Sequence, residues 1–404
     1  MVRNAFEGLK VCDFSWVVVG PLITRTLAAH GAMVVQIESN KHLGISRAVP
    51  PYTGGKPGPD TAGYFAYYNS NKLGLSLDMN HPKGPDVAER VIKWSDIVVA
   101  NFAPGMMKKW GLSYDEIKEI KRDIIMIELS NQGQTGPYSR MAALGIHLTA
   151  NAGFSQLIGW PDRDPLSMNV AWPDMIAPQF ALVTLIAALE RKRKTGEGQY
   201  LDVSQLEGAL QFLTPPLLEY YANNRQQVRS GNSSTFKAPH NVFKCRGDDR
   251  WCALSVSSDD EWIRLCRAMG NPAWAQKKKF GTMLGRKRNE EELNCRIEAW
   301  TTSLEPEKIM VLLQNVGVSA AMVANMEDIH KDPQLRSRNH FWTVNHPVQG
   351  KITTIGEPSV FSKSPAQLKK PAPLLGEDTE YVCKSLLGMS ESEFRALNDE
   401  GVFY

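Results

Sequence analysis

Cysteine is scarce in this sequence, with six residues among 404, and none of them belongs to a C-x-x-C pair. So few cysteines exclude a disulfide scaffold, and the missing pair disfavours a zinc ribbon or a thioredoxin-type site. The eight histidines form neither H-x-x-x-H nor H-E-x-x-H, so no ligand set for a metal hydrolase is visible. A G-x-S-x-G elbow for serine catalysis is missing as well.

Neither a dominant charge nor a long apolar run is present. Lys and Arg number 46 and Asp and Glu 43, which leaves a net charge of +3 and gives no case for a nucleic-acid protein. The longest apolar run, residues 181–189, covers less than half of the roughly 20 residues that a membrane span needs. The N-terminal segment MVRNAFEGLK lacks the apolar core of a signal peptide. We therefore expect a cytoplasmic protein with reduced cysteines.

What the sequence does contain is an alternation of expected strands and helices. Apolar runs at 9–14, 33–38, 97–102 and 124–129 predict strands, and helical segments at 22–30, 85–94 and 113–120 separate them. The last helix opens on the capping box Ser-Tyr-Asp-Glu. Continuous apolar strands separated by helices indicate a parallel sheet covered on both faces, so the expected fold class is α/β.

The chain is too long for one ordinary core, and its composition changes twice. A polar stretch at 223–234 and a Pro-rich, irregular stretch at 333–373 flank a segment of mixed helix and strand, with a hairpin about Gly247-Asp248. We predict a large α/β domain at 1–215, completed by 375–404, and a linker at 216–238. A small α+β domain then follows at 239–323, with a returning linker at 324–374.

The first strand and helix resemble a nucleotide site, because Glu38 ends the second strand, where dinucleotide folds place a ribose-binding acid. However, VVVGPLITRTL holds one glycine where G-x-G-x-x-G needs three, which argues against nicotinamide binding. The helix after Pro21 could bind an anion at its free amides. A plain turn between strand and helix explains the spacing equally well.

Asp174 follows Trp172-Pro173 and opens a long apolar helix. One interpretation is an N-cap whose side chain accepts the first-turn amides. The other is a nucleophile, because a carboxylate at a helix start is held ionised by the helix dipole and can attack an acyl group. Spacing does not choose between them.

Several segments then occur in one order along the chain. They are LKVCDFSWVVVGPLITRTLAAHGAMVVQIE, NSNKLGLSLDM, ANFAPG followed by KWGLSYDEI, SNQGQTGPYS, RKTGEGQYLDVSQLE and PAPLLGEDT. From Leu9 to Thr379 the chain thus resembles the class III CoA-transferase family, of the formyl-CoA transferase and carnitine CoA-transferase type. The resemblance implies a Rossmann-like large domain with a parallel sheet and a smaller α+β domain. It also implies an interlocked dimer, either a homodimer or a heteromer with a homologous subunit.

The same resemblance implies an enzyme that moves CoA from an acyl-CoA donor, succinyl-CoA first, to a carboxylic acid. CoA and acyl-CoA would be substrates, with no tightly bound cofactor, no metal, and neither nucleic acid nor membrane as a partner. The family's aspartate nucleophile falls here on Asp174, which would carry mixed-anhydride and aspartyl-CoA thioester intermediates.

CoA contacts also follow from the resemblance, position by position. The loop after the first strand would contact adenine and pantetheine, and the remaining positions are a polar, an aromatic and several basic side chains. The implied contacts are Val17, Val18, Val19, Arg47, Lys72, Asn101, Phe102 and Lys109. Without the resemblance, each of these residues would be read as ordinary packing or a solvated cation.

The sequence departs from the family pattern at two places. Gly145-Ile146-His147 stands where the family has a tyrosine and an acid beside the acyl site, so we expect a more apolar acyl pocket. The small domain lacks the glycine run of formyl-CoA transferases, which disfavours oxalate. Trp160, Met168 and Trp172 would suit an aryl-bearing acid such as benzylsuccinate.

Three alternatives remain open. One is an acyl-CoA racemase or epimerase that uses His147 as acid or base. The second is an isomerase that transfers CoA within one molecule, and the third is a non-catalytic partner subunit of a hetero-oligomeric transferase.

Overall fold

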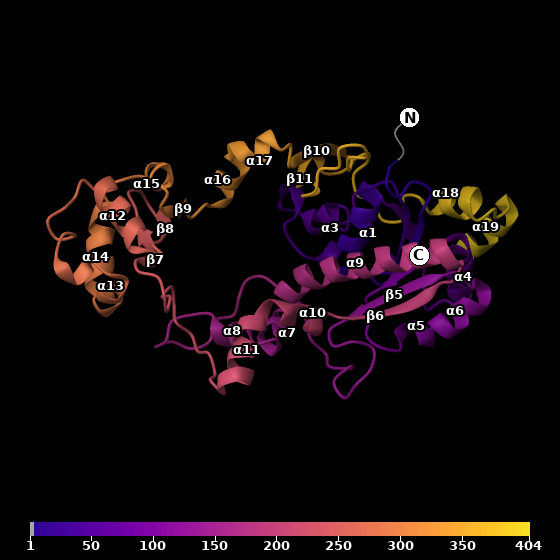
Figure 1. Cartoon of the computed structure of the whole chain (residues 1–404). Helices are drawn as coiled ribbons and strands as arrows, with labels where there is room; N and C mark the ends of the chain where they lie inside the picture. Colours follow the sequence, from indigo (N-terminus) through magenta and orange to yellow (C-terminus); the bar gives the residue numbers. More distant parts are fainter. Residues whose placement is uncertain (1–3) are drawn as a thin grey trace. The chain divides into compact units, whose positions relative to one another are not determined.

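The computed structural model describes residues 4–404 and divides into two compact units (Figure 1). The large unit holds the chain up to Phe154, then Ser167–Asn224 and Arg336–Tyr404. The small unit holds Ser155–Leu166 and Arg225–Leu335. The domain boundaries expected from the sequence stay predictions, and each unit is described by itself below.

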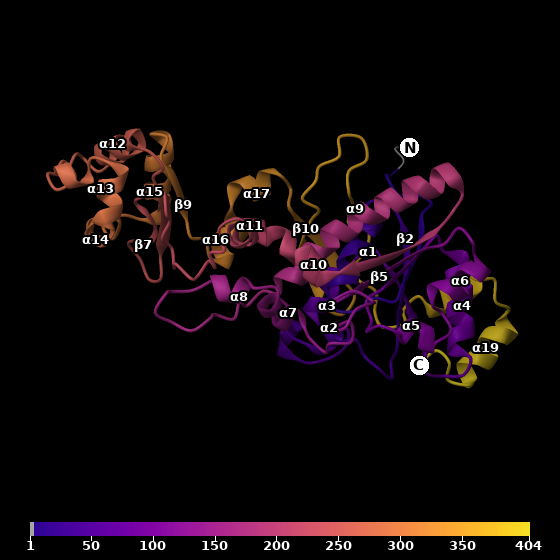
Figure 2. The same cartoon turned by 60° about the horizontal axis from the view of Figure 1, so that its bottom comes forward.

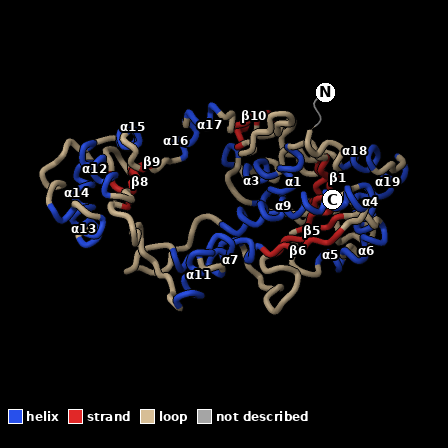
Figure 3. Tube along the Cα trace, in the orientation of Figure 1, coloured by secondary structure: helices blue, strands red, loops and turns tan. Residues whose placement is uncertain are grey.

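The large unit is built on a six-stranded parallel sheet in the order β3-β2-β1-β4-β5-β6. Its strands are β1 (Lys10–Asp13), β2 (Met33–Glu38), β3 (Leu73–Ser76), β4 (Ile97–Ala100), β5 (Ile125–Ser130) and β6 (Gln199–Ser204). The strand order reverses between β1 and β4, and Figure 3 shows these strands enclosed by helices. In such sheets, ligands bind in the crevice at the carboxyl ends of the strands beside that reversal.

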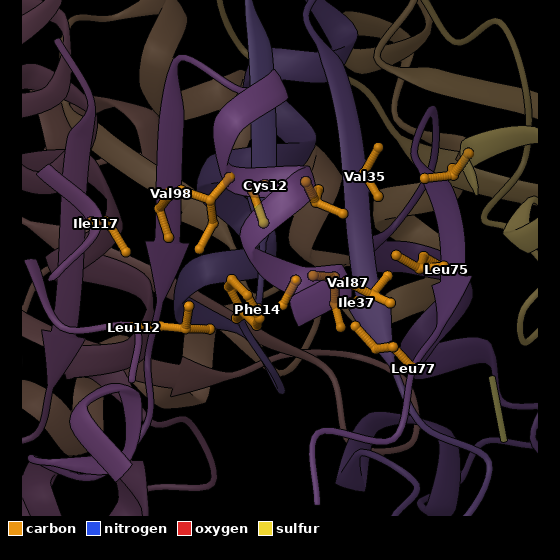
Figure 4. Close-up of a cluster of buried hydrophobic side chains, with 14 of the residues drawn as sticks. Cys12, Phe14, Val35, Ile37, Leu75, Leu77, Val87, Val98, Leu112 and Ile117 are labelled. Carbon is orange, nitrogen blue, oxygen red and sulfur yellow. The ribbon is translucent and has the colours of Figure 1, made fainter. Parts of the chain in front are cut away.

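Helices cover both faces of the sheet, as the continuous apolar strands predict. On one face, α1 (Val19–Ala29) and α9 (Trp172–Thr195) bury a cluster that includes Ile23, Ile97 and Leu185. On the other face, α4 (Gly84–Trp94) and α6 (Tyr114–Ile120) pack with the C-terminal segment, which includes α19 (Glu391–Asp399). Figure 4 shows this second cluster around Phe14 and Val98. The α/β prediction for this part of the chain is confirmed.

Shorter helices and one hairpin complete the large unit. They are α2 (Ile45–Ala48), α3 (Gly63–Tyr68), α5 (Met106–Lys109), α7 (Gly145–Asn151), α10 (Gln205–Leu210), α11 (Thr214–Asn223), α17 (Pro333–Ser337, at the border with the small unit), α18 (Thr379–Tyr381), β10 (Phe341–His346) and β11 (Gly350–Ile355). The expectation that 333–373 is irregular is wrong, because β10 and β11 form an antiparallel ladder there. Arg25 of α1 donates to the carbonyl of Ile355, which ties this hairpin to the sheet's helical cover.

The small unit has an antiparallel sheet of β7 (His240–Lys244), β8 (Trp251–Ser255) and β9 (Ser319–Met322), in that order. Its helices are α12 (Asp259–Ala268), α13 (Met283–Arg288), α14 (Glu290–Thr301), α15 (Pro306–Asn315) and α16 (Met326–Lys331), and α8 (Phe154–Leu157) lies at its border. Arg286 is fully buried and donates to Asp259 and to backbone carbonyls.

The helix α9 runs along the sheet in two views (Figures 1 and 2). It is long and apolar enough to cross a membrane by length and composition alone, but the core helix of a soluble protein passes the same test. Its buried residues, among them Ala181, Leu185 and Ala188, pack on the sheet and on α1.

Candidate active site

Two cavities lie at the carboxyl ends of the sheet strands and share Phe102 in their walls. The first has a volume of about 340 Å³, and we call it the aromatic cavity. Its walls include Phe14, Trp16, Glu38, Phe102, Lys109 and Trp110. The second has a volume of about 310 Å³, and we call it the Asp174 cavity. Its walls include Val17, Val19, Asn101, Ser130, Arg140, Gly145, Asp174 and Gln205.

The loop between β1 and α1 is held in an unusual backbone conformation. Val17 has φ +66°, a region that β-branched residues rarely adopt. Strain of this kind persists only where the surroundings fix it, and it gathers at functional sites. Val17 and Val19 line the Asp174 cavity, whereas Val18 is buried and outside both cavity walls.

Asn101 fixes this loop. Its Oδ1 accepts the N–H of Trp16 at 2.7 Å, and its Nδ2 donates to the carbonyl of Trp16 at 2.7 Å. Both polar ends of the amide are therefore engaged by the residue before Val17. Asn101 also lines the Asp174 cavity, and the CoA contact that the resemblance implies for it stays a prediction.

Aromatic rings surround the first cavity. Phe102 lies edge-on to Trp16 and to Trp110, with ring centroids 5.3 and 5.2 Å apart, and Trp110 stacks near Phe14. The indole Nε1 of Trp110 is buried and meets no acceptor among residues 4–404. Lys109 is exposed in the same wall and forms no ion pair with a described residue. Aromatic rings with an unpaired donor and a free cation in the same wall suit a phosphorylated aromatic base.

Asp174 lies in the first turn of α9 and faces the second cavity half-buried. It is not the N-cap, which is Ala171, and no N–H among the described residues donates to its carboxylate. The capping interpretation is therefore wrong. Burial raises the pKa of Asp174 to about 6, so desolvation outweighs the helix dipole that the sequence suggested. At pH 7 the carboxylate is still roughly nine-tenths ionised.

The α7 backbone approaches the Asp174 carboxylate closely. A Cβ atom at Gly145 would overlap Oδ2 of Asp174 and lie 2.6 Å from Cβ of Ala171. Only glycine therefore leaves the carboxylate its present position.

Tyr64 and Tyr68 of α3 also lie within electrostatic range of Asp174. Burial first, and then the Asp174 charge, raise the pKa of Tyr64, and the pKa of Tyr68 is raised by the same causes together with neighbouring phenols. The sequence interpretation missed both tyrosines, although the run GYFAYY was a visible signal.

Two predicted CoA contacts lie elsewhere. Arg47 is buried, donates to both carboxylate oxygens of Glu38 at 2.7 and 2.8 Å, and pairs with Asp60 at 2.9 Å. Lys72 is fully buried and donates to Asp13 at 3.0 Å and to Asn69 at 2.7 Å. Neither lines the aromatic cavity or the Asp174 cavity. We do not carry either forward as a phosphate contact, because each cation is already neutralised by a buried carboxylate whose loss of partner would be costly.

Apolar and polar residues line the Asp174 cavity together, and the apolar acyl pocket expected from the sequence stays a prediction. Neither Met168 nor Trp172 lines the Asp174 cavity, and Trp160 belongs to the small unit. Apolar residues such as Val17, Phe102 and Leu144 do line it. Polar side chains lie in the same wall, where the chain leaves the ends of β5 and β6: Ser130, Asn131, Ser139, Arg140 and Gln205.

His147, the acid or base of the racemase alternative, lies outside the Asp174 cavity. His147 is exposed on α7, its Nδ1 accepts the N–H of Leu144 at 3.2 Å, and it is outside the cavity wall. In the range 4–404, no group of three or more His, Cys, Asp or Glu is arranged to hold a metal ion.

Comparisons with known proteins agree on one family. The sequence model of CoA-transferase family III matches residues 6–379. A succinyl-CoA–D-citramalate CoA-transferase of Chloroflexus aurantiacus is 27% identical over 406 residues, covering 98% of this chain and 97% of its own. A formyl-CoA:oxalate CoA-transferase of Bradyrhizobium is 27% identical over 420 residues, covering 99% and 97%.

Two further comparisons extend the picture. A probable CoA-transferase of Mycobacterium tuberculosis is 31% identical over 409 residues, but the chain spans only 50% of that relative's length. The crystal structure of a CaiB/BaiF family protein from Brucella suis superposes with a TM-score of 0.86 at 25% identity, covering 95% of this chain and 100% of the other.

Proposed function

Because the chain belongs to CoA-transferase family III, a family of transferase enzymes that use CoA thioesters, we propose that it moves CoA between acids through Asp174. The observation that carries the proposal is the placement of this carboxylate. It lies in the wall of a cavity that adjoins a second, aromatic cavity through Phe102. No described residue donates a hydrogen bond to it, so its lone pairs are free to attack an acyl carbon.

The reaction divides into two symmetrical halves. The carboxylate of Asp174 attacks the thioester carbonyl of the donor, and CoA leaves as a thiolate, which gives a mixed anhydride. The thiolate then attacks the aspartyl carbonyl of the anhydride, releasing the donor acid and leaving an aspartyl-CoA thioester. The acceptor carboxylate attacks this thioester, and the returning thiolate attacks the acceptor carbonyl, which frees Asp174 and the new acyl-CoA.

The two cavities divide the CoA molecule between them in this proposal. The adenine ring would lie among Trp16, Phe102 and Trp110, with a phosphate near Lys109. The pantetheine arm would pass Phe102 and the Val17–Val19 loop to reach the Asp174 cavity. Lys109 can serve as a point charge for phosphate, although it lacks the bidentate geometry of arginine.

Succinyl-CoA is the donor we favour, as for the Chloroflexus relative whose name includes it. An aryl-substituted acceptor such as benzylsuccinate stays a prediction. We place the enzyme in the cytoplasm, in keeping with its family.

We further propose that the chain works as an interlocked dimer with a second copy or a homologous subunit. The outer side of α9, together with the 212–221 segment, exposes large apolar side chains. They are Phe180, Val183, Ile186, Phe212, Leu218 and Tyr221, the last exposed by 76%. Exposed apolar side chains of this size are typical of protein–protein interfaces when they form a patch.

Intact-protein mass spectrometry tests the mechanism. The protein is mixed with succinyl-CoA and then with hydroxylamine, beside Asp174→Ala and a matched control, Asp162→Ala, whose carboxylate is exposed on the small unit. We expect a hydroxylamine-labile CoA adduct on the wild type and on the control but not on Asp174→Ala. Turnover retained by Asp174→Ala would refute the mechanism. An absence of adduct with every donor would favour a racemase, an isomerase or a subunit that needs its homologous partner.

A further inference from the structure

Two buried polar groups in the wall of the Asp174 cavity have no partner in the protein. Ser130 is the last residue of β5 and only 5% exposed, and its Oγ meets no hydrogen-bond partner among the described residues. Gln205 is the first residue of α10 and equally buried, and its Oε1 meets none within 4–404 either. Leaving such groups unpaired is costly, so each calls for an explanation.

The fold holds the two groups in the same wall. Ser130 pairs in register with Ser204, the residue before Gln205, on the adjacent strand β6. The N–H of Leu206 donates to the carbonyl of Asn131 at 3.0 Å, which fastens the start of α10 to the loop after β5. Both side chains line the cavity that Asp174 lines.

Contact with α9 fixes the position of α10 as well. A Cβ atom at Gly208 would lie 3.5 Å from the Cα of Ala177, one turn of α9 beyond Asp174. The helix that carries Gln205 therefore packs on the helix that carries the nucleophile, and Gln205 itself is buried.

The chemistry of the two groups selects their ligand. An amide oxygen only accepts hydrogen bonds, so it needs a donor and would repel a carboxylate oxygen. A serine hydroxyl both donates and accepts. A hydroxyl group can pair with either of them, whereas an alkyl chain pairs with neither. A site of this kind discriminates strongly against an analogue that lacks the hydroxyl, because the protein groups then stay unpaired.

We propose that Ser130 and Gln205 form a specificity site for a hydroxyl group on the acyl chain, so that the acceptor is a hydroxy-substituted carboxylic acid. This inference rests on the proposed CoA transfer at Asp174. It adds a hydroxyl group to what is expected of the acceptor acid, and it assigns discrimination to two residues that the sequence interpretation did not single out.

The experiment compares acids in matched pairs that differ by one hydroxyl: 3-hydroxybutyrate with butyrate, 2-hydroxybutyrate with butyrate, and malate with ¹³C-labelled succinate. Two readouts are taken for each acid. The first is the rise in melting temperature with CoA present, which reports binding without turnover. The second is kcat/KM for transfer from succinyl-CoA. The variants are Ser130→Ala, Gln205→Met and Gln205→Leu, with Gln211→Leu, an exposed glutamine on the same stretch, as the control.

For the wild type and the control we expect at least one pair in which the hydroxy acid is favoured about 10-fold or more. In the variants that preference should fall to about 2-fold, while transfer to the deoxy acid and the Asp174 adduct persist. Gln205→Met keeps the side-chain length, so it separates lost recognition from a collapsed fold.

Other outcomes overturn the inference. Equal binding of hydroxy and deoxy acids to the wild type would contradict it. Variants that weaken the binding of every acid or every acyl-CoA alike would also contradict it, because Ser130 and Gln205 would then serve packing, an ordered water or the pantetheine arm. Binding that discriminates without any transfer would instead contradict the proposed function and leave the hydroxyl site standing.

Discussion

The aromatic cavity and the Asp174 cavity share one wall residue but differ in how far their polar groups have partners within the protein. Around the first, the charged groups mostly have partners: Glu38 is neutralised by Arg47, and Asp78 pairs with Lys41 at 2.9 Å. In the second, the Asp174 carboxylate, the Ser130 hydroxyl and the Gln205 amide oxygen have no partner among the described residues. The first cavity is thus suited to hold a constant group by shape, and the second to interact with a variable one through unsatisfied polar atoms.

The largest difference between the two cavities is expected from a substitution beside the nucleophile, which should change catalysis without changing CoA binding. In Gly145→Ala, the new methyl group would overlap the Asp174 carboxylate and displace it. We expect kcat to fall about 100-fold, as for a displacement of about 1 Å in other active sites, with CoA affinity unchanged. Steady-state kinetics and CoA titration check this.

The matched control is Gly208→Ala, whose methyl group would meet only ordinary contacts, the nearest at 3.5 Å. A loss of activity of similar size in the control would mean that glycine replacements act through the fold and not through Asp174.

Lowering the pH should slow the reaction at the Asp174 cavity, because it protonates the Asp174 carboxylate. Burial raises the pKa of Asp174 to about 6, and only the ionised carboxylate attacks the thioester. The adduct-forming rate should therefore be level above pH 7 and fall about tenfold for each pH unit below 6. Rapid-quench mass spectrometry from pH 4.5 to 8 measures it. A rate that stays level down to pH 4.5 would contradict the raised pKa.

The same pKa has a consequence for stability, with the opposite dependence on pH. The folded state binds the Asp174 proton more tightly than the unfolded chain, whose pKa is near 3.8, so this group lowers the free energy of unfolding as the pH rises from about 4 to 6. Asp174→Asn removes the buried charge. Its melting temperature should exceed that of the wild type at pH 7.5 by more than it does at pH 4.5.

The free cation of the aromatic cavity should affect binding alone. Lys109→Ala should raise KM for acyl-CoA by about 5-fold, the scale of an exposed ion pair, with kcat unchanged and with a weaker dependence of KM on salt. Lys108→Ala, an exposed neighbour outside the cavity wall, is the control. Equal effects of the two substitutions would show a general field of positive charge rather than a phosphate contact at Lys109.

The smallest effect is expected at Trp110. Trp110→Phe keeps the apolar surface but removes the unpaired Nε1 donor, so KM should rise about 3-fold, the scale of one neutral hydrogen bond. The measurement is KM for acyl-CoA against that for an analogue without the adenine base. A Trp110→Phe effect that persists with the truncated analogue would place the donor away from the base.

Much of the fold could be predicted from the sequence because its signals are local. Residues 33–38 form β2 as expected, and the capping box at Ser113 opens α6. The strand β3 was missed, since its four residues, Leu73–Ser76, include a glycine and carry no long apolar run. The β10–β11 hairpin was missed because prolines around it concealed two strands.

The candidate site was predicted less evenly. Six of the predicted residues do lie in the walls of the two cavities: Val17, Val19, Asn101, Phe102, Lys109 and Asp174. Arg47 and Lys72 do not, because their partners Glu38 and Asp13 come from the ends of neighbouring strands, β2 and β1. A sequence shows that a cation exists but not which carboxylate neutralises it.

The sequence alone determined the alternation of strands and helices, the parallel sheet and the family, since these follow from apolar periodicity and from motifs that can be read within a few residues. The tertiary structure decided which polar groups are free to act. It buried Arg47 and Lys72 in ion pairs, engaged the Asn101 amide with Trp16, and left Asp174, Ser130 and Gln205 unpaired in one wall. The reason is physical. The hydrogen-bond partner of a buried polar atom often comes from a residue far away in the sequence, so a local sequence pattern does not reveal whether the atom has one.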